Sequence, residues 1–432
     1  MRRDFLKLCS LAGLGVAAPV GWPGLARAAA REPEPYGGPY YAVFNASGGW
    51  DTTYLMDPKG VGETNRLYKE GDILTEGQHR FAPNAAHIEN GLSNEDFFAR
   101  YASELLVFNG LDYSVNNHAP CSRYMATGKL DSLAYPTFAA LVAACRGPEC
   151  PLAFLTFGNY SATGNLVPMA RVPYLPTLAL IANADYVGGN ADNPYHDDFA
   201  NDRIESALKD QTDARVDRAR LPRLGHAQSM LYAAQLNSKA LQRVTPHIPD
   251  KSPDERLSRQ AEIALASFKA GVCVSANLSI GQFDSHANND RDQMNLIPEL
   301  LAGIDYTLRR AEELEIRDQL VVVIQSEMAR TPDYNKGDGK DHWSIGSAMF
   351  MGAGITGNRV VGATDGGQFL VPIDPQTLAT TDDEDTGLRV RPEHIHQSLR
   401  EFAGIADHPF SKKFPLAIPD AERLQGFWQG GA

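Results

Sequence analysis

An acid and an imidazole stand two residues apart, shortly after a strongly apolar segment. The segment GVCVSANLSI at residues 271–280 is predicted to be a buried strand, and Asp284 and His286 follow it in FDSH. Either these side chains are solvated groups of a turn, or both bind a metal ion. Carboxylate oxygen and imidazole nitrogen suit zinc, manganese, iron or magnesium better than a thiolate-type site does. The spacing therefore marks a candidate metal site.

Other acids and imidazoles follow further apolar segments. Asp51 comes after YYAVFNASGGW and Glu327 after DQLVVVIQS, with His342 in the following loop, and His118 follows LLVFNGLD by a short loop. In a mostly parallel sheet, ligands lie beyond the carboxyl ends of the strands. We therefore expect these side chains to meet at one edge of the sheet. There they would repel one another or take up protons unless cations neutralised them.

Segments with helical spacing separate the predicted strands, among them NEDFFARYASELL, PTFAALVAACR, DERLSRQAEIALASFKAG and MNLIPELLAGIDYTLRRAEEL. Wholly apolar strands between helices are typical of a sheet covered on both faces. The expected fold is α/β, a three-layer αβα sandwich with a mostly parallel sheet over residues 40–365. The polar residues 183–250 are predicted to be a helical and loop insertion or cap. Residues 366–432 are predicted to be a loop-rich extension packed on the same domain.

The chain begins with a predicted export signal. Residues 2–7 read RRDFLK, a short apolar run follows, and ARA at residues 26–28 is a cleavage-site pattern, so residues 1–28 resemble a twin-arginine signal peptide. The run is shorter than the about 20 apolar residues of a membrane span. We therefore expect no stable membrane anchor, a periplasmic or secreted protein, and the twin-arginine export machinery as a partner.

The formal net charge of −13 argues against nucleic acid or an anionic membrane as the main partner. A small anionic substrate stays possible, because a local metal ion overrides the global field. Cys145 and Cys150 flank Arg-Gly-Pro-Glu, and the spacing leaves open whether they form a disulfide loop. Neither a Walker A sequence nor a Gly-x-Ser-x-Gly turn occurs, which disfavours nucleotide hydrolysis and an α/β-hydrolase.

Five motifs, taken in their order, resemble a known family. They are GGWD at 48–51, HAPCSRYMATG at 118–128, FDSHANN at 283–289, SEMARTP at 326–332 and KDHWS at 340–344. This set is similar to the exported family called domain of unknown function 1501, within the alkaline phosphatase and sulfatase superfamily. The resemblance implies an alkaline phosphatase-like fold and one or two divalent ions per chain, with zinc, manganese or magnesium as candidates.

The resemblance also implies roles for single residues. Asp51 stands where the superfamily has a metal-binding acid after the first strand, and Asp284 with His286 resembles its Asp-x-His metal pair. His342 matches a final histidine of the first metal's shell. Asp284, His286 and His342 would hold one cation. Asp51, together with Glu327, would hold the other.

Two positions depart from the superfamily pattern. Met328 stands where an imidazole would follow the later acid. Sulfatases carry a modified cysteine in Cys-x-Pro-Ser-Arg, and alignment on Thr127-Gly128 puts His118 in its place. Cys121 lacks the required x-Pro-Ser-Arg, so conversion to formylglycine is disfavoured. His118 is therefore a candidate nucleophile, general acid or base, or metal ligand, with Thr52 or Thr53 as weaker hydroxyl candidates.

The leading hypothesis is a metal-dependent hydrolase of phosphate or sulfate esters that acts on a small anionic substrate. Arg330 could clamp an anionic oxygen in bidentate fashion, or it could simply pair with Glu327. The alternative is a catalytically silent exported binding or assembly protein that keeps the fold. Met328 and the unusual His118 favour that alternative.

Overall fold

A single eight-stranded sheet organises the computed structural model, which describes residues 34–83, 90–183, 186–187, 193–218, 238–383 and 387–429. The strand order is β12-β4-β11-β8-β1-β7-β5-β6. The strands are β1 (Tyr40–Ala46), β4 (Leu105–Asp112), β5 (Phe154–Thr156), β6 (Met169–Ala170), β7 (Ser275–Ile280), β8 (Leu320–Ser326), β11 (Ile345–Gly352) and β12 (Arg359–Val361). The predicted signal peptide, residues 1–28, lies outside the described residues.

The sheet is mostly parallel, as the sequence predicts. β1 pairs in parallel with β7 and β8, and β5 pairs in parallel with β6 and β7. Only β11 runs against its neighbours β4 and β8, which leaves β4 pointing the same way as β8. The carboxyl ends of β1, β4, β7 and β8 therefore share one edge of the sheet.

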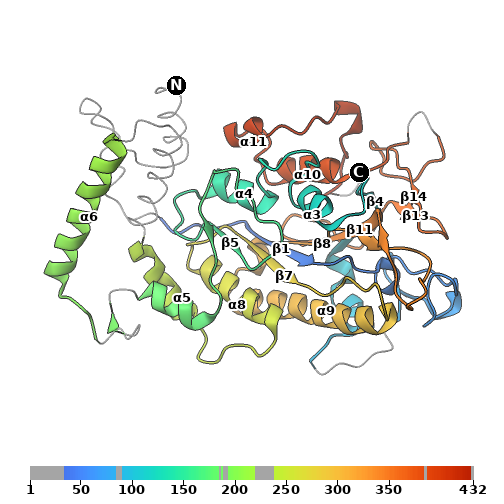
Figure 1. Ribbon diagram of the computed structural model, residues 1–432, viewed down its shortest axis with the longest axis horizontal. Helices are drawn as coiled ribbons and strands as arrows, with labels where there is room; N and C mark the ends of the chain where they lie inside the picture. Colours follow the sequence, from blue (N-terminus) through green and yellow to red (C-terminus); the bar gives the residue numbers. More distant parts are fainter. Residues whose placement is uncertain are drawn as a thin grey trace.

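Helices cover both faces, which confirms the three-layer prediction (Figure 1). One layer contains α2 (Asn94–Tyr101), α5 (Leu175–Ala182), α8 (Arg256–Lys269) and α9 (Asn289–Glu313). The other contains α3 (His118–Thr127), α4 (Phe138–Arg146), α10 (Pro392–Phe402) and α11 (Pro409–Lys413). Because side chains alternate along a strand, β1 sends Tyr40, Ala42 and Phe44 into one core and Tyr41 and Val43 into the other.

Short elements complete the described chain. Three two-stranded ribbons pair β2 (Leu74–Glu76) with β3 (His79–Phe81), β9 (Ala329–Arg330) with β10 (His342–Trp343), and β13 (Ala363–Thr364) with β14 (Leu370–Val371). The 3-10 turns are η2 (Thr52–Tyr54), η3 (Glu70–Asp72), η4 (Ala102–Glu104), η6 (Ser238–His247), η7 (Arg317–Gln319) and η8 (Asp420–Glu422). Among the described residues, no helix combines the length and apolar character needed to cross a bilayer.

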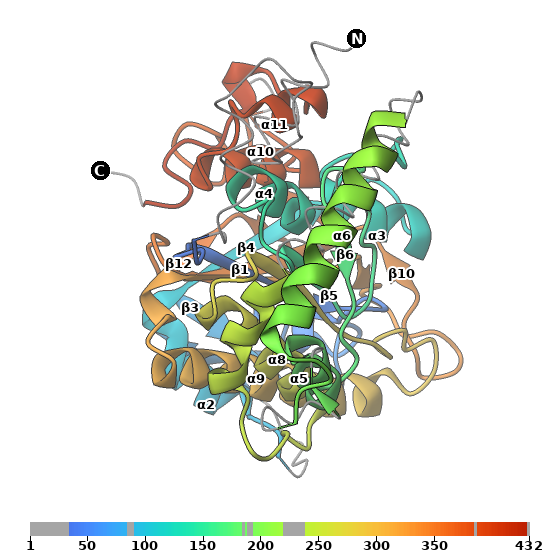
Figure 2. The same ribbon diagram turned by 90° about the vertical axis from the view of Figure 1, so that its left-hand side faces the viewer.

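Two peripheral segments differ in how they meet the sheet layers. The helix α6 (Asp198–Arg218) stands at one end of the molecule, away from the sheet (Figures 1 and 2). The C-terminal segment instead contributes Phe427 and Trp428 to the core beneath α10. The four cysteines of the described chain, Cys145 and Cys150 among them, are free thiols.

Candidate metal centre

Loops from several strand ends bring a group of polar side chains together. His118 is the first residue of α3 after β4, Asp284 and His286 lie between β7 and α9, and His342 begins β10. Close packing of the loop after β1 requires glycine: Gly48 has φ +118°, and a Cβ there would lie 2.5 Å from the backbone nitrogen of Asp284. The backbone at this edge therefore permits the approach of side chains that are distant in sequence.

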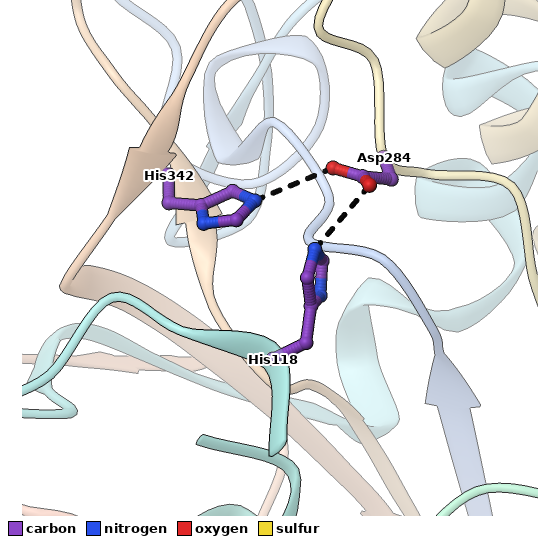
Figure 3. Close-up of side chains that lie close together, drawn as sticks. All are labelled: His118, Asp284 and His342. Carbon is purple, nitrogen blue, oxygen red and sulfur yellow. Dashed lines mark ion pairs between the residues drawn. The ribbon is translucent and has the colours of Figure 1, made fainter. Parts of the chain in front are cut away.

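Three imidazoles turn their Nε2 atoms toward the carboxylate of Asp284. His118 Nε2 lies 3.3 Å from Oδ2, and His286 Nε2 and His342 Nε2 lie 3.1 and 3.4 Å from Oδ1. Figure 3 shows His118 and His342 pointing at Asp284 from different elements. One ligand atom each from His118, Asp284 and His342 lies within 4.8 Å of the other two, which is compatible with a shared metal ion.

Each imidazole is fixed through its second nitrogen. The Nδ1 atoms of His118, His286 and His342 pair, in that order, with Glu327 Oε1 at 3.1 Å, Asp341 Oδ1 at 2.8 Å and the backbone oxygen of Asn116 at 2.8 Å. These partners accept hydrogen bonds, so in the neutral imidazole the proton sits on Nδ1 and the Nε2 lone pair faces the cluster. Metal-binding histidines almost always have such a partner.

The spacing of the Nε2 atoms supports the same conclusion. His286 Nε2 and His342 Nε2 lie only 3.0 Å apart. With both Nδ1 atoms protonated, two lone pairs would face each other at that distance and repel. A cation or a proton between them removes the repulsion. The donor set of His118, His342 and Asp284 fits a divalent ion, and His286 Nε2 lies beside two of these ligands.

Charges around the cluster favour ionised Asp284. Its partial burial raises the pKa, but the hydrogen bond from Arg330 and the positive charge of that guanidinium, with smaller contributions from His118 and His286 when those rings are protonated, more than offset this, so the pKa lies below its ordinary value. The hydrogen bond to Glu327 raises the pKa of His118. Glu327 is 5% exposed, and its second oxygen, Oε2, has no hydrogen-bond partner.

Asp51 is not brought into the imidazole cluster. Its buried carboxylate lies 2.7 Å from Lys340 Nζ and accepts hydrogen bonds from Asn289 Nδ2 at 3.0 Å and Thr53 Oγ1 at 2.6 Å. Lys340 is itself fully buried and donates to the backbone oxygen of Thr64. The ammonium group of Lys340 thus faces Asp51 at the place where the family resemblance implies a second metal ion.

Arg330 is placed behind Asp284 rather than in open solvent. Its buried guanidinium donates to Asp284 Oδ1 at 2.8 Å, to the backbone oxygens of Gly48 and Gly49, and to that of Lys340. All three of its nitrogens are engaged. The structure therefore shows Arg330 as an anchor for the acid and for the loop after β1.

The other sequence candidates have defined places as well. Glu327 contacts His118 and accepts from the backbone N–H of Gly48 at 2.8 Å, so it supports an imidazole. Met328 is fully buried in the core, and Thr53 is bound to Asp51. Burial raises the pKa of Cys121 to about 11, which keeps its thiol protonated at neutral pH. The sequence motifs predict no role for Asn116 or Lys340, and they place Asp341 only in the loop with His342.

Comparison with known proteins agrees with the resemblance seen in the motifs. Residues 200–403 match the model of the family described as "Protein of unknown function (DUF1501)", which confirms the predicted family resemblance over that segment. No curated protein matches the chain.

Similar solved structures include a sulfatase from Pseudoalteromonas sp., with 9% identity, 94% of this chain and 73% of that chain covered, and a TM-score of 0.36. A phosphonate monoester hydrolase of Agrobacterium radiobacter has 10% identity, coverages of 92% and 78%, and a TM-score of 0.34. At such values the likeness carries no inference about activity, which has to come from the site itself.

Asp341→Asn tests whether the outer partners support metal binding. The amide retains the shape but loses the charge that orients His286, so we expect metal affinity to fall by about 10- to 100-fold. Competition with a chromogenic chelator measures this change. Asp338→Asn, in the same loop but paired with Arg66, is the control and should leave metal affinity unchanged. Equal affinities in the two variants would contradict the role of Asp341.

Proposed function

We propose that the protein is an exported metal-dependent hydrolase of phosphate or sulfate esters with one divalent ion at the imidazole cluster. The observation that carries the proposal is the convergence of three Nε2 atoms on ionised Asp284, with each Nδ1 held by an acceptor. Nitrogen-rich ligation favours zinc or manganese over magnesium, which prefers oxygen. When bound, such an ion supplies Lewis-acid polarisation of an ester oxygen.

The residues of the chain would bind and orient both the ion and a small anionic ester. The side chains of His118, Asp284 and His286 are between a third and a half exposed, so the cluster is open to a small molecule. Arg330 holds Asp284 in place, and Glu327 keeps the His118 proton on Nδ1. His118 Nε2 is thereby left as a ligand or as an acceptor for a substrate proton.

The proposed place of action is the periplasm or the exterior, reached through the twin-arginine export machinery. This part of the proposal rests on the RRDFLK and ARA patterns in residues 1–28. Because that pathway carries folded proteins, the ion would be acquired before export.

Metal removal tests the proposed reaction. The full chain, purified without chelators, should contain about one equivalent of a divalent ion and hydrolyse an aryl phosphate or aryl sulfate. We expect dialysis against a chelator to abolish hydrolysis and one added divalent ion to restore it. His118→Ala should lower the rate, whereas His196→Ala, an exposed histidine just before α6, should not. Hydrolysis unaffected by the chelator would overturn the proposal.

A catalytically silent binding or assembly protein is the second candidate. The internal pairing of Asp51 with Lys340 and the full engagement of Arg330 favour it, because neither charge is free to contact a substrate. One equivalent of bound metal without hydrolysis of either ester class would support this candidate over the enzyme.

A further inference from the structure

A cleft adjoins the metal centre through residues next to its histidines. It has a cavity volume of about 590 Å³, within the range of small-molecule sites. Asp341, which binds His286, lines it, and so does Trp343, which follows His342 in β10. A molecule held at the metal centre could therefore extend into this cleft.

Aromatic rings form much of the cleft wall. Tyr334, Trp343 and Phe369 all line it, and the rings of Trp343 and Phe369 meet edge to face at 5.2 Å. Phe369 is 56% exposed, so part of its ring is open to a ligand in the cleft. The indole N–H of Trp343 is already used, because it donates to the backbone oxygen of Gln368. What these rings offer a ligand is their π faces.

The charged residues of the wall are all acidic. Glu63, Asp333 and Asp341 line the cleft, and its lining contains neither lysine nor arginine. Within the described chain, Glu63 and Asp333 form no ion pair. An additional anionic group in this space would be repelled by these carboxylates, whereas a cation would be attracted.

Cations already gather around one wall of the cleft. The guanidinium carbon of Arg66 lies 3.9 Å from the centre of the Tyr334 ring, and Lys340 Nζ lies 5.1 Å from it. Arg66 is also paired with Asp338 and Lys340 with Asp51, so the contacts show that the Tyr334 ring accepts cations close to it, while acids outside the cleft hold those cations in place. Trp343 and Phe369 present the same type of surface, and no lysine or arginine of the described residues lies over either ring.

We propose that the cleft binds the ammonium-bearing part of a small zwitterionic ester, whose anionic group lies at the metal centre. Aromatic faces combined with carboxylates are the general means of recognising alkylated ammonium groups. The assignment of this group to the substrate rests on the proposed function. The binding of an ammonium compound in the cleft does not depend on hydrolysis.

Calorimetric titration of the full chain tests the binding step. We compare choline with 3,3-dimethyl-1-butanol, which has the same shape but carries no charge. Choline is expected to bind about tenfold more tightly. Phe369→Leu keeps an apolar side chain but removes the ring, so it should weaken choline binding several-fold. Phe199→Leu, on the exposed face of α6, is the matched control and should have no effect.

The outcomes separate this inference from the proposed function. Equal affinities for the two compounds, or no choline binding at millimolar concentration, would overturn the cleft assignment even if an aryl phosphate is hydrolysed. Choline binding that Phe369→Leu weakens, without any ester hydrolysis, would support the cleft and reject the enzyme. Co-sedimentation with phosphatidylcholine vesicles is not expected, and its appearance would replace the small ester with a lipid headgroup.

Discussion

Asp284→Asn is expected to reduce bound metal to a small fraction of one equivalent and ester hydrolysis by about 100-fold or more. Loss of an outer partner of a metal ligand typically costs 10- to 100-fold, and Asp284 is a proposed direct ligand. Its carboxylate faces all three Nε2 atoms, and the amide would leave the ion without its only anionic ligand in the cluster. Elemental analysis and initial rates measure the two effects.

Two further variants separate metal loss from unfolding. Asp284→Asn also deprives buried Arg330 of its anionic partner, so its thermal unfolding has to be compared with that of the wild type. His342→Ala removes a ligand without touching Arg330 and should lose metal as well. Asp407→Asn changes an exposed acid paired with Lys412 and should alter neither property. If Asp284→Asn and His342→Ala both keep the metal content of the wild type, the proposed metal centre is wrong.

Lys340→Met is expected to destabilise the protein by about 3–5 kcal/mol, because it leaves the fully buried Asp51 carboxylate without a counter-charge. Removing one partner of a buried pair costs more than the pair contributes, since the remaining charge stays desolvated. Denaturant unfolding of the full chain measures the loss. Lys412→Met breaks an exposed pair with Asp407 and should cost less than about 1 kcal/mol.

A double variant tests whether the stability loss comes from the unpaired charge of Asp51. Lys340→Met combined with Asp51→Asn removes both charges, and we expect part of the lost stability to return. Metal analysis of Lys340→Met adds a second readout. A rise from one to two equivalents would show that Asp51 holds a cation once the ammonium is gone, as the sequence resemblance implied. A stability loss below about 1 kcal/mol would contradict the burial of the pair.

Asp51 and Asp284 take similar places in the fold but have different partners. Both acids follow parallel strands, and both lie at the same edge of the sheet, because β1 and β7 are hydrogen-bonded neighbours. Their partners nevertheless differ: Asp284 faces imidazoles, whereas Asp51 faces an ammonium group. The residue that decides this is Lys340, nearly three hundred residues further along the chain.

Local patterns in the sequence predict the alternation of apolar strands and helices, and hence the layered α/β fold and the edge at which polar residues gather. Those features follow from local patterns, since burial on two faces requires strands that are apolar throughout. Three features cannot be read from local patterns: β11 runs antiparallel, Arg330 is enclosed by backbone carbonyls, and Lys340 neutralises Asp51. These depend on which side chains meet in a desolvated interior, where each buried charge takes the partner that long-range packing brings to it.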